Sequence, residues 1–218
     1  MRTSSAILLA CWAIAISAQA QGFKFSNPPP EAAAEANAQE ARQDMISDQL
    51  ATPCRNRIKN RKIMVLIGEE RNGQVYATQG NFSRHVASVN KRLLSLGLRT
   101  YSPEQIRRQV AQEEVDAYFK NDPDRALSAS RRLAAQYVLK GVIASHAVRN
   151  PIINVNQVSV NLDFTLSDAS GRPVSTASAR NESYAGSDVS GMALTLIEER
   201  ADEVVARLYS DYCRNASR

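Results

Sequence analysis

A strict alternation of apolar and polar residues near the end of the chain constrains the fold more than any other feature. Five apolar residues stand at every second position: Val158, Val160, Leu162, Phe164 and Leu166. The residues between them are polar: Ser159, Asn161, Asp163 and Thr165. A period of two places successive side chains on opposite faces of a β-strand, whereas an apolar helix face recurs every three or four residues. The stretch therefore predicts a strand with one buried face, and a buried face requires a sheet that packs against another layer.

The segments around this strand predict the rest of the fold. A turn at Asp168–Gly171 and a returning strand at 173–184 complete a β-hairpin. The other predicted strands span residues 63–67, 98–101 and 137–143, and residues 69–80 are expected to be a polar loop. The predicted helices span residues 82–96 and 102–119, a segment that begins at 123, and residues 188–212. The order β-α-β-α-α-β-β-β-α predicts an α/β (α+β) fold with a mixed β-sheet and packed helices.

Local signals support two of these helices. One face of the first helix is apolar, with Phe82, Val86, Val89, Leu93 and Leu96. The second helix begins with Ser102, Pro103 and Gln105, the residues of a capping box with proline at the first helical position.

The first 20 residues are typical of a cleavable export signal. Arg2 precedes the apolar stretch Ala6–Ile16, and Ala18–Ala20 has the small-x-small pattern of a cleavage site. The apolar stretch is shorter than the roughly 20 residues that a membrane-spanning helix needs, so the mature chain is expected to begin at Gln21. Leu8–Cys11 loosely matches a bacterial lipobox, and a lipid anchor on Cys11 stays open as the alternative.

After this signal, residues 21–53 are predicted to be a leader or spacer and residues 54–218 a single globular domain. Three consecutive prolines, Pro28–Pro30, favour an extended backbone. Residues 31–50 are rich in Ala, Gln and Glu, which have good helix propensity, but offer few large apolar side chains to bury. The segment is therefore interpreted as a marginal spacer helix, with a partner-binding helix as the alternative.

Two cysteines remain after removal of the signal, Cys54 and Cys213. One stands just before the first predicted strand and the other near the end of the last predicted helix. Disulfides form and persist in the oxidising compartments that exported proteins reach. We expect a Cys54–Cys213 disulfide that ties together the two ends of the domain; two free thiols are the alternative.

Few residues of this chain are suited to catalysis or metal binding. Its two histidines, His85 and His146, show no HxH or HxxxH spacing, so neither a metal site nor a cofactor is expected. Glu69 and Glu70 follow the first strand at its carboxyl end, where α/β sites often lie, but adjacent side chains point apart and solvated carboxylates are expected. The sequence carries no phosphate-binding glycine pattern. We expect a protein that is not an enzyme.

The chain is mildly basic, with 27 Lys and Arg against 22 Asp and Glu. The densest basic run comprises Arg55, Arg57, Lys59, Arg61 and Lys62. Such a run predicts a patch for an anionic partner, which could be lipopolysaccharide, peptidoglycan or an acidic protein, and a solvated basic surface is the alternative. Nucleic acid is not expected, because aromatic residues make up only 6% of the chain and leave little for base stacking.

Four segments carry a resemblance to a known family. They are the strand Lys62–Ile67, the helix end and strand Leu93–Tyr101, the helix end and strand Ala134–Ile143, and the hairpin Val158–Val174. Their order and spacing resemble a family of bacterial envelope domains that includes the curli-secretion lipoprotein CsgG, the penicillin-binding-protein activator LpoB and the N-terminal domain of TolB.

This resemblance implies a non-enzymatic accessory role in cell-envelope assembly or secretion, through binding of envelope proteins. Formation of a homo-oligomer stays open. The expected location is the periplasm, with an outer-membrane lipoprotein as the alternative. Two other functions stay open: a pore-forming secretion subunit of the curli type, and a small periplasmic hydrolase whose site is assembled from distant residues. The extra pair of long alternating strands that a curli-type pore needs is not evident in the sequence.

Overall fold

The computed structural model describes residues 30–77, 84–120 and 122–215. The predictions for the signal segment, for Gln21 and Cys11 and for Phe82 lie outside these residues. The chain divides into two compact units, Met1–Asn37 and Ala38–Arg218. The described part of the first unit is the beginning of helix α1 (Pro30–Leu50), and all that follows concerns the second unit.

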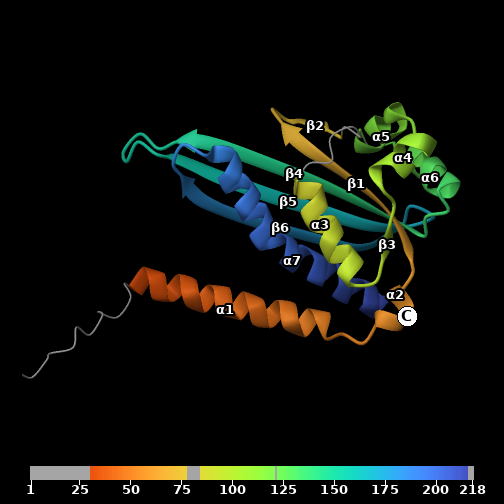
Figure 1. Ribbon diagram of the computed structural model, residues 1–218, viewed down its shortest axis with the longest axis horizontal. Coiled ribbons are helices and arrows are strands. Elements are labelled where there is room, and N and C mark those ends of the chain that lie inside the picture. The colour runs from red at the N-terminus through yellow and green to blue at the C-terminus, as the bar shows by residue number, and fades with distance from the viewer. Residues whose placement is uncertain (1–29, 78–83, 121, 216–218) are drawn as a thin grey trace, which may run out of the picture. The chain divides into compact units, whose positions relative to one another are not determined.

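Six strands form one mixed sheet in the second unit (Figure 1). They are β1 (Lys62–Arg71), β2 (Gln74–Tyr76), β3 (Arg99–Thr100), β4 (Tyr137–Arg149), β5 (Asn156–Asp168) and β6 (Pro173–Ala185). The strand order is β2-β1-β4-β5-β6, with β3 paired to the first residues of β1. β1 runs parallel to β3 and β4, whereas the β1–β2, β4–β5 and β5–β6 pairs are antiparallel.

Helices cover the two faces of this sheet unequally. Besides α1 they are α2 (Arg55–Ile58), α3 (Arg84–Ser95), α4 (Pro103–Gln109), α5 (Gln112–Phe119), α6 (Pro123–Arg132) and α7 (Val189–Asn215). α3 and α7 lie across one face, as Figure 1 shows, and build the larger core with β1, β4, β5 and β6. The shorter helices α4, α5 and α6 contribute a smaller core that covers Met64, Leu66 and Val138 on the opposite face.

The alternation in β5 is confirmed residue by residue. Its five apolar side chains are 1–7% exposed and belong to the larger core: Val158, Val160, Leu162, Phe164 and Leu166. Asp163 is exposed on the other face, and Ser159 and Asn161 are half-buried. The mixed α/β sheet with packed helices is therefore present as predicted.

Two strands differ from the prediction. β1 continues through Glu69–Arg71 and turns back at Asn72–Gly73 into β2, where a polar loop was expected. Both turn residues have positive φ, 53° and 75°, which asparagine and glycine adopt more readily than other residues. β4 continues six residues past Ile143 because its pairing with β5 extends to Arg149. Since Ser145–Arg149 is exposed, it has no apolar pattern that could have predicted this extension.

The helix expected at 102–119 is two helices. Ser102 and Gln105 form the predicted capping box. The backbone N–H of Gln105 donates to Ser102 Oγ across 3.2 Å, and the backbone N–H of Ser102 donates to Gln105 Oε1 across 2.8 Å. The break comes at Val110, whose backbone is extended (φ −125°, ψ 121°) and whose side chain is 2% exposed in the smaller core. Burial of this β-branched side chain outweighs continuation of the helix.

Candidate protein-docking surface

The free end of the β4–β5 hairpin and the adjoining end of β6 carry the most exposed large apolar side chains of the described residues. Ile152 is 89% exposed and Val148 67%, while Ile153 and Tyr184 are each 53% exposed. Figure 1 shows this end of the hairpin extending past the beginning of α7. We call Val148, Ile152, Ile153 and Tyr184 the hairpin-end surface.

The strand register brings two of these side chains onto one face of the sheet. Val148 in β4 pairs with Gln157 in β5, and Gln157 pairs with Tyr184 in β6. Residues that face one another across strands point to the same side of a sheet. Val148 and Tyr184 therefore flank Gln157 on the face opposite α3 and α7.

Hydrogen bonds fix the loop that presents Ile152 and Ile153. The Oδ1 atom of Asn150 accepts from the backbone N–H groups of Ile152 (2.9 Å) and Ile153 (3.4 Å). The Asn150 N–H donates to the Val155 carbonyl (2.8 Å), and the Asn154 N–H donates to the Asn150 carbonyl (2.9 Å). A loop held in one conformation loses little further freedom when a partner binds it.

The loop also carries a positive charge beside its apolar residues. Arg149 is exposed, and its Nε donates to Asn154 Oδ1 across 2.7 Å. Asn154 has φ 56°, a left-handed conformation that asparagine tolerates better than most residues. An exposed apolar patch with a polar rim is typical of protein interaction sites.

An open, polar hollow of about 400 Å³ lies on the same sheet face nearer its centre. Its lining residues are Glu70, Ala144, His146, Asn161, Asp163, Ser178, Ala179 and Arg180. Ala144 and Ser178 are short, which leaves space between the longer side chains. His146 and Asp163 are both exposed here, as expected for solvated residues. Within the described residues, no cluster of three or more His, Cys, Asp or Glu side chains could hold a metal ion.

Glu69 and Glu70 do not converge on a common site. Glu69 Oε2 lies 2.7 Å from an Arg71 guanidinium nitrogen, and Glu70 lines the polar hollow. The side chain of His85 lies outside the described part of the structure.

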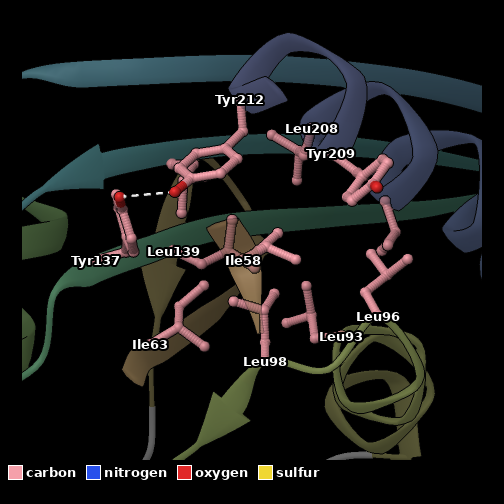
Figure 2. Close-up of a pocket in the computed structure, with 12 residues that line it drawn as sticks. Ile58, Ile63, Leu93, Leu96, Leu98, Tyr137, Leu139, Leu208, Tyr209 and Tyr212 are labelled. Atoms are coloured by element: carbon pink, nitrogen blue, oxygen red, sulfur yellow. Dashed lines mark hydrogen bonds between the residues drawn. The ribbon is translucent and has the colours of Figure 1, made fainter. Parts of the chain in front are cut away.

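A small apolar cavity lies between the sheet and helices α3 and α7 (Figure 2). Its volume is about 20 Å³, close to the space of a single water molecule. Two tyrosines meet at its edge: the hydroxyl groups of Tyr137 and Tyr212 lie 3.0 Å apart, and their rings pack edge to face with centroids 5.3 Å apart. Burial, together with the hydrogen bond to Tyr212, raises the pKa of Tyr137 to about 12. A cavity this small is a feature of core packing and leaves no room for an organic ligand.

A disulfide joins Cys54, just before α2, to Cys213 near the end of α7. The two Cα atoms are 5.4 Å apart, and the residues are 3% and 1% exposed. The bond closes a separation of 159 residues and ties the first and last elements of the domain, as the sequence analysis expected.

The basic run is exposed along its whole length: Arg55, Arg57, Lys59, Arg61 and Lys62. Arg55 and Arg57 belong to α2, and Arg61 Nε donates to the Arg57 carbonyl across 3.0 Å. An adjoining open hollow is lined by Leu50–Arg57 and Tyr209. The five side chains lie within one short segment, but their binding of an anionic partner stays a prediction.

No conclusion was drawn from the sequence about the adjacent apolar residues Ile152 and Ile153. Two adjacent isoleucines, preceded by Asn150 and Pro151 and followed by Asn154, were the available signal. None of the helices described by the structure is long and apolar enough to cross a membrane.

No protein-family model matches the sequence, and neither does any curated protein. Solved structures do match in fold. CT253 from Chlamydia trachomatis is 13% identical with a TM-score of 0.50, over 72% of this chain and 99% of that one. Lipoprotein GNA1162 from Neisseria meningitidis is 14% identical (TM-score 0.46, 66% of this chain, 97% of that one). The LpoB C-terminal domain from Salmonella enterica is 17% identical (TM-score 0.40, 64% of this chain, 94% of that one). At these identities the likeness concerns the fold alone.

Proposed function

We propose that this chain is an exported, non-enzymatic accessory protein of the bacterial cell envelope, and that it acts in envelope assembly or secretion by binding another protein. The observation that carries the proposal is the hairpin-end surface, where Ile152 is 89% exposed on a loop held by hydrogen bonds. A large apolar side chain that stays in water does not contribute the stabilisation that its burial would bring. Binding of a partner that buries this side chain supplies that stabilisation.

The cysteine pair supports the extracytoplasmic part of this proposal. Structural disulfides are rare in the reducing cytosol and common in exported proteins. Cys54 and Cys213 are buried and bonded to one another. The export-signal pattern of residues 1–20 agrees with this compartment.

The basic run has a secondary place in the proposal. Five exposed cations within eight residues attract anionic groups on a partner, and such attraction weakens as salt is added. We assign this run, Arg55–Lys62, to long-range attraction of an acidic partner surface rather than to a specific contact. Charge reversal there should slow association, whereas loss of the hairpin-end surface should speed dissociation.

Copurification of variants tests the proposal. The full chain, with an affinity tag and expressed with its own signal, is cross-linked in growing cells and isolated from the envelope fraction. Ile152→Asp and Ile153→Asp should each reduce the recovered partner severalfold, because each places a charge in the centre of an apolar contact.

Leu94→Asp is the matched control. Leu94 is also a large apolar residue, 50% exposed, but it lies on α3, across the sheet from the hairpin-end face. Recovery of the same partner at the same level from Ile152→Asp, Leu94→Asp and the unmodified chain would contradict the proposed docking role.

A further inference from the structure

Strand β6 ends the sheet, and its outer edge faces no other strand of the described residues. β6 has 13 residues, Pro173–Ala185, and pairs regularly with β5 from Ser175 onward. Proline and the one register irregularity occur only at its beginning, near Pro173. A long, regular edge strand presents unpaired backbone groups to any strand that can lie beside it.

The side chains of β6 are self-complementary when the strand meets a copy of itself in antiparallel orientation. The exposed Arg180 and Glu182 stand two residues apart on the same face, with a separation of 3.7 Å between guanidinium nitrogen and carboxylate oxygen. If two copies are related by a two-fold axis through Asn181, Arg180 of each chain faces Glu182 of the other. Opposite charges that face one another across antiparallel strands stabilise the pair.

The same charges disfavour the neighbouring registers. A two-fold axis perpendicular to the sheet places the polar faces of both β6 strands on the same side of the sheet. The alternative registers of this pairing differ in the residue on which the axis is centred, which changes by one residue at a time. Centred on Arg180, the pairing sets two arginines face to face, and centred on Glu182 it sets two glutamates face to face. Like charges directly opposite one another are destabilising, so the sequence favours the register centred on Asn181.

The helix side of β6 leaves room for this pairing. Its residues there are mostly small: Ala177, Ala179, Asn181, Ser183 and Ala185. The Asn181 amide donates to Glu199 of α7 across 2.7 Å. Arg42 of α1 lies near Glu203 of α7, with 3.8 Å between their nearest charged atoms.

We propose that this protein forms a two-fold dimer by antiparallel pairing of β6 with β6 of a second copy, centred on Asn181. The strand that pairs with the outer edge of β6 is thus β6 of a second copy of the chain. The reciprocal Arg180–Glu182 pairs favour this partner. Such an isologous contact closes on itself and gives a dimer, whereas a head-to-tail contact would give a ring or a filament. The proposal does not depend on the docking role of the hairpin-end surface, with which β6 shares only Tyr184.

A charge-swap series tests the dimer. The purified full-length mature chain is examined by sedimentation equilibrium over a concentration series at low salt. The unmodified protein should show the mass of two chains. Arg180→Glu alone and Glu182→Arg alone should shift the mass towards one chain, because each creates like-charge pairs. The double variant Arg180→Glu/Glu182→Arg restores both opposite-charge pairs and should return the mass to two chains.

Lys91→Glu is the control for a change of charge alone, since Lys91 is exposed on α3 away from β6. Circular dichroism checks that each variant keeps its fold. The proposal is overturned by an unmodified protein that stays a monomer throughout, by larger assemblies whose mass the swaps leave unchanged, or by a double variant that remains as dissociated as the single ones.

A cysteine at the centre of the pairing gives a second, geometric measurement. Facing Cα atoms in an antiparallel pair lie about 4.5–5.5 Å apart, within the range that a disulfide spans. Asn181→Cys should therefore form a covalent dimer under mild oxidation. Ser178→Cys should not, because its two copies would lie about 20 Å apart at 3.3 Å per residue. Equal cross-linking of both variants would contradict the register.

Discussion

Phe164 shows how single residues decide the position of β5. Its side chain is 2% exposed in the larger core, and it faces Gly141 across the β4–β5 pair. A Cβ atom at Gly141 would clash with the Phe164 ring, so the ring occupies the space that a larger residue would fill. Glycine at 141 and phenylalanine at 164 are therefore matched across the two strands.

We predict that Phe164→Ala lowers the free energy of unfolding by about 3–5 kcal/mol, because it leaves a cavity in a packed core. Asn161→Ala should cost much less, since Asn161 lies on the opposite face and is only half-buried. Urea denaturation of both variants measures the difference. Equal losses for the two would mean that the assigned faces of β5 are wrong.

Tyr137 gives a prediction about pH. Its pKa is raised to about 12 in the folded protein, first by burial and then by the hydrogen bond to Tyr212, against an ordinary value of 10.0. Between these values the unfolded chain loses the tyrosine proton while the folded chain keeps it. The resulting stabilisation is present below pH 10 and is lost as the pH rises towards 12.

The unfolding free energy of the unmodified protein should thus fall more steeply above pH 10 than that of Tyr137→Phe, which has no such proton to lose. Denaturation at a series of pH values measures the two slopes. Parallel slopes would refute the role of Tyr137.

At the scale of helices and strands, the sequence predicted those elements that depend on interactions between residues close together in the chain. β5 was predictable because one buried face imposes a period of two, and the start of α4 was predictable because the capping box involves residues three apart. The break at Val110 depends on burial against distant elements, and the extension of β4 to Arg149 depends on pairing with β5. The hairpin-end surface escaped prediction because the exposure of Ile152 depends on whether distant elements pack against the loop, which the local sequence does not encode.

The disulfide yields the prediction at this scale, because it joins the segment before α2 to the last turns of α7. In the chain-entropy description, closing so long a loop is worth at most about 5 kcal/mol, and often less. Cys54→Ser/Cys213→Ser should melt several degrees lower, since each 1 kcal/mol shifts a domain of this size by about 2–4 °C. Calorimetry without reductant measures the shift; reactive thiols at both positions in the unmodified mature protein would rule out the bond.

For the whole molecule, the unequal covering of the sheet is the feature that matters for function. α3 and α7 bury one face of β1, β4, β5 and β6, whereas α4, α5 and α6 cover the other face only around β1 and the first residues of β4. The uncovered part carries the polar hollow and ends at the hairpin-end surface. A molecule with one complete and one incomplete layer has a surface available for a partner.

Site-specific photo-crosslinking at Ile152 in living cells tests the docking role most directly. A photoreactive phenylalanine analogue replaces Ile152 in one strain and Leu94, the exposed residue on α3, in another. Illumination followed by mass spectrometry identifies any covalent adduct in the envelope fraction. A discrete adduct with one envelope protein at Ile152, and its absence at Leu94, is the predicted result. Illumination that gives no protein adduct at Ile152, or the same adducts at both positions, would contradict the account.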